Sequence, residues 1–259
     1  MAAHAYKDIS LEMKGHVAVI TLRRPPHNYF DNALIREIAH AFEQCDSDVN
    51  VRSLVLAAEG KSFCAGADLV NRSDTGTVAE GGQHLYKEAA RLFRARKPVV
   101  AAVQGAAIGG GLGLACMADF RVAAPEARFS ANFARLGMHP GFGLTEVLPR
   151  LVGQQKAALL FYTARRISGE EAVKIGLADM LVPQAELSAA ALKLAEEIAE
   201  AAPLAILSIR ETLRRGLVEA VERATERELV EQEWQRRTAD FKEGVTATNE
   251  RRPAKFLGR

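Results

Sequence analysis

An apolar run at 98–103 is followed almost at once by three consecutive glycines, Gly109, Gly110 and Gly111, and no other feature constrains the fold of this chain as strongly. The run predicts a buried strand, because it is far shorter than a membrane span. The glycines open a segment that reads as a helix, and glycine lets backbone N–H groups approach a ligand closely. This order predicts an α/β protein whose ligand binds at the carboxyl ends of the strands.

Strands and helices alternate through the first two-thirds of the sequence. Apolar runs predict strands at 16–22, 51–57, 98–103 and 120–123, and helical spacing predicts helices at 31–45 and around 85–93. Beyond residue 143 strand signals almost vanish, and the sequence predicts helices starting at 168 and at 203, with others at 184–201 and 217–241. This pattern predicts an α/β fold with a largely buried, mostly parallel sheet.

Composition excludes several classes of protein. The 259 residues carry 34 basic and 32 acidic side chains, a net charge of +2, so we expect no nucleic-acid partner. The amino terminus lacks an apolar signal sequence and no run is long enough to span a membrane, so we expect no membrane association. Three widely spaced cysteines argue against disulfides or a metal site and predict a reducing, cytoplasmic location.

Two small-residue loops follow predicted strands, at 62–69 and at 109–111. Backbone N–H groups from two such loops can converge on one point and form an oxyanion hole for a carbonyl oxygen. The dinucleotide pattern GxGxxG and the phosphate-binding pattern ending in GKS or GKT are both absent here. Each loop taken alone is also compatible with a tight packing turn between strand and helix.

Three segments carry a resemblance to a known family. FCAGADL at 63–69, KPVVAAVQGAAIGGGLGLACMAD at 97–119 and ISGEEAVKIGLADMLVP at 167–183 resemble the enoyl-CoA hydratase/isomerase, or crotonase, family, and so does the tail RRPAKFLGR. The resemblance implies a crotonase-like fold, with a core of repeated ββα units in a spiral over residues 1–195. It also implies a C-terminal helical region over 196–259 that assembles a homotrimer or homohexamer.

The resemblance also implies an acyl-CoA site. The backbone amides of Ala67 and Gly110 would polarise the thioester carbonyl, and Ala65, Asp68 and Leu69 would contact the coenzyme A part of the substrate. Basic residues such as Arg24 and Lys255 would approach its phosphates. Members of this family use no metal and no redox cofactor, so we expect none here beyond the coenzyme A that the substrate carries.

The acid/base residues depart from the family pattern. Gly113 and Phe133 occupy the positions of the two glutamates of the hydratases, and Gly141 occupies the position of a carboxylate in other branches. Hydration needs groups that move protons, and glycine and phenylalanine cannot do so. His139 is our first candidate for a replacement base. Glu146 is the second, with an ion pair to Arg150 as the structural alternative.

We therefore predict an acyl-CoA-processing enzyme whose reaction differs from ordinary hydration. Because Gly113 removes side-chain volume and Phe133 adds an apolar wall, we expect a bulky or aromatic acyl group. Two alternatives remain open at this point. One is a catalytically silent acyl-CoA-binding protein, and the other is an oxyanion-hole hydrolase that acts on a carbonyl compound without coenzyme A.

Overall fold

A computed structural model describes residues 5–68 and 84–259, and two sheets form its centre. The six-stranded sheet has the order β1-β2-β3-β5-β7-β10, and all neighbours run parallel except the pair β1 and β2. Every residue of β5 is buried, as expected for a strand covered on both faces. The predicted parallel sheet is confirmed. Its strands are β1 (Ile9–Lys14), β2 (Val17–Leu22), β3 (Ser53–Ala58), β5 (Val99–Val103), β7 (Phe120–Ala123) and β10 (Met180–Leu181).

The second sheet is made of strands too short for a sequence pattern to reveal. Its order is β4-β6-β8-β9, and its members are β4 (Ser62–Cys64), β6 (Ala106–Ile108), β8 (Arg128–Ser130) and β9 (Ile167–Ser168). β4, β6 and β8 each follow directly on a strand of the first sheet. In one unit β5, β6 and a helix follow one another, which is the ββα repeat that the resemblance implied.

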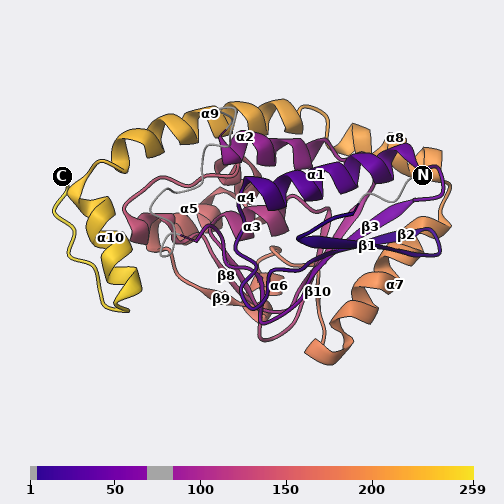
Figure 1. Ribbon diagram of the computed structural model, residues 1–259, viewed down its shortest axis with the longest axis horizontal. Coiled ribbons are helices and arrows are strands. Elements are labelled where there is room, and N and C mark those ends of the chain that lie inside the picture. Colours follow the sequence, from indigo (N-terminus) through magenta and orange to yellow (C-terminus); the bar gives the residue numbers. More distant parts are fainter. Residues whose placement is uncertain (1–4, 69–83) are drawn as a thin grey trace.

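Helices cover both faces of the large sheet (Figure 1). α7 packs its buried alanines against valines of β3, β5 and β7 on one side, while α1 and α2 lie on the other side beneath the long α9. The helices are α1 (Asn32–Ser47), α2 (Leu85–Ala90), α3 (Gly110–Cys116), α4 (Leu144–Val152), α5 (Gln154–Thr163), α6 (Gly169–Lys174), α7 (Leu187–Glu200), α8 (Pro203–Leu213), α9 (Leu217–Gln235) and α10 (Ala239–Asn249).

Helix starts follow the sequence more closely than helix ends do. Asp31 caps α1 by accepting a hydrogen bond from the Leu34 amide, and Pro203 stands in the first turn of α8. The helix predicted over 217–241 was wrong at its end, because α9 stops at Gln235 and α10 begins after Thr238. The Thr238 side chain accepts a hydrogen bond from the Phe241 amide, which starts a new helix.

A partly buried ion-pair cluster ties the end of α8 to the core. Asp119, at the end of the glycine-rich segment, lies 2.9 Å from both Arg210 Nε and Arg214 Nη1 at the end of α8. Residue 195, where we placed the boundary of the core, falls inside α7, which packs on the large sheet. No helix in the described part of the chain is long and apolar enough to cross a bilayer.

Candidate active site

The two small-residue loops meet, as the sequence predicted. β4 and β6 pair in parallel, with Cys64 opposite Ala107, so the segments that follow them start side by side. A Cβ atom placed on Gly66 would lie 3.8 Å from the Gly110 nitrogen and 2.8 Å from the Ile108 oxygen. The turn at 64–67 is therefore packed against the first residue of α3.

The backbone N–H groups of Ala67 and Gly110 belong to two residues that face the same space. Both residues line the same cavity. Gly110 is the first residue of α3, so its N–H has no acceptor within the helix. Within the described ranges, neither amide donates a backbone hydrogen bond in a turn or loop. Two such donors on one cavity can bind the oxygen of a polarised carbonyl.

A different steric constraint excludes a side chain at each glycine of the 109–111 run. Gly109 has a φ of +57°, which an L side chain rarely adopts. A Cβ on Gly110 would lie 2.3 Å from the Phe30 ring, and one on Gly111 would lie 1.9 Å from the Cys64 carbonyl oxygen. Packing and the close approach of α3 to β4 thus already require the glycines, whether or not a ligand binds there.

The cavity at these amides is small and mostly apolar. Its volume is about 50 Å³. The strand ends contribute backbone from 65–67 and 108–110, and the remaining wall comes from α2, the turn at 132–138 and the end of α9. The side chains on that wall are Leu85, Tyr86, Asn132, Phe133, Leu136, Met138 and Arg236.

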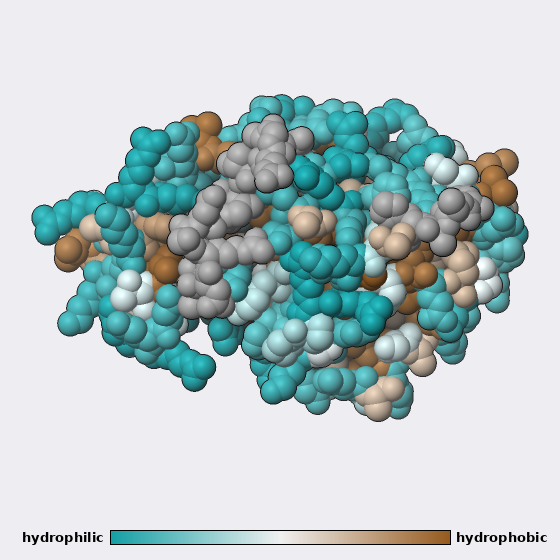
Figure 2. All heavy atoms as spheres, in the orientation of Figure 1, coloured by the Kyte–Doolittle hydropathy of each residue, from teal (hydrophilic) through white to brown (hydrophobic). Residues whose placement is uncertain are grey.

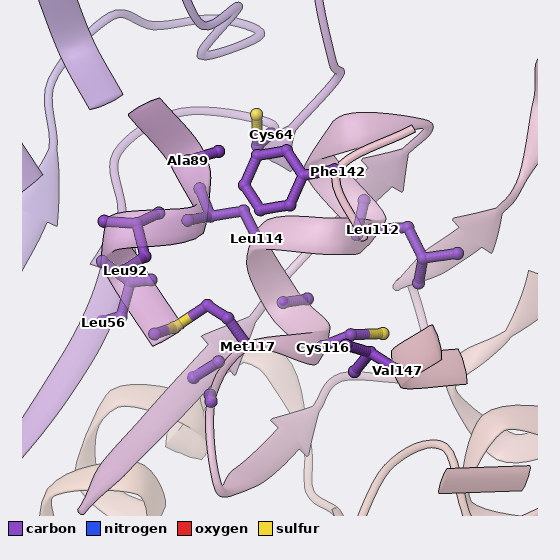
Figure 3. Packing of buried hydrophobic residues seen from close by; sticks show 14 of the residues in the cluster. Leu56, Cys64, Ala89, Leu92, Leu112, Leu114, Cys116, Met117, Phe142 and Val147 are labelled. Carbon is purple, nitrogen blue, oxygen red and sulfur yellow. The ribbon is translucent and has the colours of Figure 1, made fainter. Parts of the chain in front are cut away.

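Aromatic rings fill the space that Gly113 and Gly141 provide. A Cβ on Gly113 would lie 2.6 Å from the ring of Phe142, and a Cβ on Gly141 would lie 2.2 Å from the ring of Tyr86. Figure 3 shows the Phe142 ring lying against α3 near Leu114. The expected free volume beside Gly113, and with it the argument for a bulky acyl group, was therefore wrong.

Comparison with known proteins identifies the family of this chain. The family model described as "Enoyl-CoA hydratase/isomerase" matches residues 12–259. The chain belongs to the enoyl-CoA hydratase/isomerase family. A protein of Syntrophomonas wolfei named "Crotonyl-CoA hydratase" is 37% identical over 98% of this chain and 100% of its own length. A "Probable enoyl-CoA hydratase" of Bacillus subtilis is 36% identical over 96% of this chain and 98% of its own.

Solved structures show the same fold. An enoyl-CoA hydratase/isomerase from Pseudoalteromonas atlantica superposes with a TM-score of 0.88 at 30% identity, covering 97% of this chain and 100% of that one. The crotonase-type fold that the resemblance implied is thereby confirmed for this member of the enoyl-CoA hydratase/isomerase family.

The two acid/base candidates of this family member lie away from the cavity. The His139 ring donates from Nδ1 to the Pro140 oxygen at 2.9 Å, and His139 is absent from the cavity wall within the described residues. Glu146 accepts a hydrogen bond from Arg150 Nε at 2.7 Å, one turn along α4. The ion pair was the structural alternative for Glu146, and the structure shows it.

Not all of the residues expected to hold coenzyme A lie at the cavity. Ala65 lines the cavity. Asp68 lies near Tyr29, and the pKa of Tyr29 is raised mainly by burial and to a smaller extent by the charge of Asp68. Arg24 pairs with Asp8 and, at 2.9 Å, with Asp31. The Lys255 backbone amide donates a hydrogen bond to the carboxylate of Glu243 in α10. Leu69 lies outside the described residues. The structure does not bring Lys255 to the cavity.

Sequence reasoning missed Glu228, a carboxylate of α9 with no exposed surface. It accepts hydrogen bonds from the amides of Gly143 and Thr145, at 2.8 and 3.0 Å, and from the Thr145 hydroxyl at 2.6 Å. Burial raises the pKa of Glu228 to about 7 against the effect of these donors. Glu228 thereby fixes the start of α4 and the adjoining turn, which contains Phe142. Among the many acidic residues of α9, no sequence signal distinguishes it.

Proposed function

We propose that this protein is an acyl-CoA enzyme that polarises a thioester carbonyl with the amides of Ala67 and Gly110 and catalyses a reaction other than simple hydration. The observation that carries the proposal is the cavity itself. It holds both amides, while aromatic rings occupy the space beside Gly113 and Gly141. Carbonyl polarisation stabilises an enolate or a tetrahedral oxyanion whatever group supplies the proton.

Hydration of crotonyl-CoA should be weak. Two acid/base groups contribute about 10²–10⁴-fold each, so we expect a kcat/KM about 10⁴-fold or more below that of a hydratase that carries both. Steady-state kinetics on purified protein, beside the Syntrophomonas wolfei relative named "Crotonyl-CoA hydratase", measures the difference. Equal values for the two proteins would show that the acid/base positions at 113 and 133 are assigned wrongly.

One observation favours a catalytically silent binding protein as the second candidate. Within the described part of its wall, the cavity presents no carboxylate, and burial raises the pKa of Tyr86 to about 12, so its phenol stays protonated near neutral pH. Binding of coenzyme A thioesters without turnover of any of them would favour this candidate. Failure to bind any thioester would favour the hydrolase that acts without coenzyme A.

We expect the protein to assemble as a trimer or hexamer. Apolar side chains are exposed on α8 and α9: Leu204, Ile209, Leu213, Val230 and Trp234. Figure 2 shows a mostly hydrophilic face, with apolar side chains near the end where α7 and α8 lie in Figure 1. Sedimentation equilibrium should give three or six times the 28.1 kDa of one chain. A mass of 28.1 kDa at micromolar concentration would contradict this assembly.

A further inference from the structure

Three polar side chains on one face of α9 hold the turn at 139–145. Glu228, Gln232 and Gln235 are spaced by four and three residues, so they lie on the same side of the helix. Glu228 accepts the amide and hydroxyl hydrogen bonds at the end of the turn. At the start of the turn, Gln232 Nε2 donates to the His139 carbonyl oxygen at 2.8 Å, and Gln235 Oε1 accepts from the His139 amide. α9 therefore holds both ends of this turn.

The backbone between these two attachments takes a conformation that L residues rarely adopt. Phe142 has a φ of +68°, and Gly143, which follows it, has a φ of +69°. A residue other than glycine keeps such a φ only where its surroundings hold it there. The Gly143 N–H, which directly follows Phe142, donates to Glu228 Oε2 at 2.8 Å. The buried carboxylate thus holds the peptide unit that carries the Phe142 ring.

The Phe142 ring packs directly on the backbone at the start of α3, because glycines there leave no side chain between them. A Cβ on Gly113 would lie 2.6 Å from this ring, and one on Gly110 would lie 3.4 Å from it. The rings of Phe30 and Tyr86 meet the Phe142 ring edge-on, with centroids 5.8 and 6.1 Å away. Because packed interiors leave little free space, a shift of the ring is transmitted to the first turn of α3.

We infer that Glu228 is a positioning residue of the acyl-CoA site: it holds the turn at 139–145, the turn holds the Phe142 ring against α3, and the ring fixes the Gly110 N–H where it meets the thioester oxygen. This inference rests on the proposed function, because it needs the Gly110 amide to be a donor to that oxygen. Glu228 has no exposed surface and is absent from the cavity wall within the described residues, so it acts through the turn and does not touch the substrate.

Glu228→Gln tests the inference by infrared spectroscopy of bound butyryl-CoA labelled at the carbonyl carbon. Glutamine has the size of glutamate, but its NH₂ group cannot accept a hydrogen bond, so it cannot serve both the Gly143 and the Thr145 amide. Hydrogen bonds from the protein lower the carbonyl frequency below its value in buffer. The variant should lose about half of this lowering, because one of two oxyanion-hole donors is displaced. Full lowering in the folded variant would overturn the inference.

Glu226→Gln is the matched control for the loss of one negative charge from α9. Glu226 lies on the same helix, two residues before Glu228, and its side chain is exposed. This control should keep the full lowering of the carbonyl frequency. The spectra are recorded with saturating butyryl-CoA, so that a change in affinity does not alter them. An equal loss in both variants would mean that the charge of α9 sets the frequency and the turn does not, and the inference would fall.

A backbone variant decides the question if Glu228→Gln fails to fold. Glycolic acid at position 143 removes the N–H that donates to Glu228 and leaves the carboxylate and every side chain in place. It should also reduce the lowering of the carbonyl frequency, and full lowering would overturn the inference. If the unmodified protein shows no lowering at all, the proposed function itself fails and the inference falls with it. That outcome differs from full lowering in every variant, which overturns only the role of Glu228.

Discussion

Replacing the Gly110 N–H by an ester oxygen should lower turnover of the enzyme's substrate by about 10²–10³-fold, the usual effect of losing one oxyanion-hole donor. The change is made by incorporating glycolic acid at position 110, which removes the hydrogen and adds no side chain. Proline would be a poor probe, because a Cβ at this position would lie 2.3 Å from the Phe30 ring. Single-turnover kinetics with the substrate measures the loss.

Glycolic acid at position 111 is the matched control. The Gly111 N–H also lies in the first turn of α3, but Gly111 does not line the cavity within the described residues. This control should retain most of the activity. Infrared spectroscopy of bound butyryl-CoA labelled at the carbonyl carbon gives a readout without turnover. An unchanged carbonyl frequency with the ester at 110 would exclude this amide as a donor to the thioester.

Gly113→Glu should destabilise the protein by about 3 kcal/mol or more, and it should not create a hydratase. The new Cβ would meet the Phe142 ring at 2.6 Å, which is a severe overpacking, and the carboxylate would enter a buried site. Urea denaturation measures the free energy of unfolding, and the crotonyl-CoA assay measures the activity. A variant of unchanged stability that hydrates crotonyl-CoA would show that Phe142 moves aside freely.

A double-mutant cycle isolates the contact between positions 113 and 142. Phe142→Gly alone should lower stability, because it leaves a cavity among Phe30, Tyr86 and α3. Glycine also suits the φ of +68° at this position, which offsets part of that loss. The combined variant should be more stable than the sum of the two single effects predicts, by about 1–3 kcal/mol. Simple additivity would mean that the two positions do not interact.

The sequence was informative where structure is specified locally. Asp31 and Ser168 predict helix starts, because their side chains accept hydrogen bonds from the backbone amides three residues further on, those of Leu34 and Glu171. The long parallel strands are visible as apolar runs. The strands of the second sheet are only two or three residues long, so no periodicity can mark them, and their place depends on the strands that precede them.

The site could be predicted from the sequence only in its backbone part. The loops around Ala67 and Gly110 carry their own signal, because small residues follow strand ends in both. Phe142, Tyr86 and Arg236 carry none: they come from distant segments and meet only when α2 and α9 pack together over the turn at 139–143. The contacts of Phe142 with Gly113 and of Tyr86 with Gly141 arise in three dimensions, and a single sequence does not contain them.

The Gly113–Phe142 contact also restricts how this protein can be changed by laboratory evolution. A carboxylate at 113 collides with the ring, and loss of the ring first leaves an empty space, so each single step lowers stability before any benefit can arise. Selection through one substitution at a time will therefore discard both steps. A library that is meant to install hydratase chemistry has to vary positions 113 and 142 in the same clone.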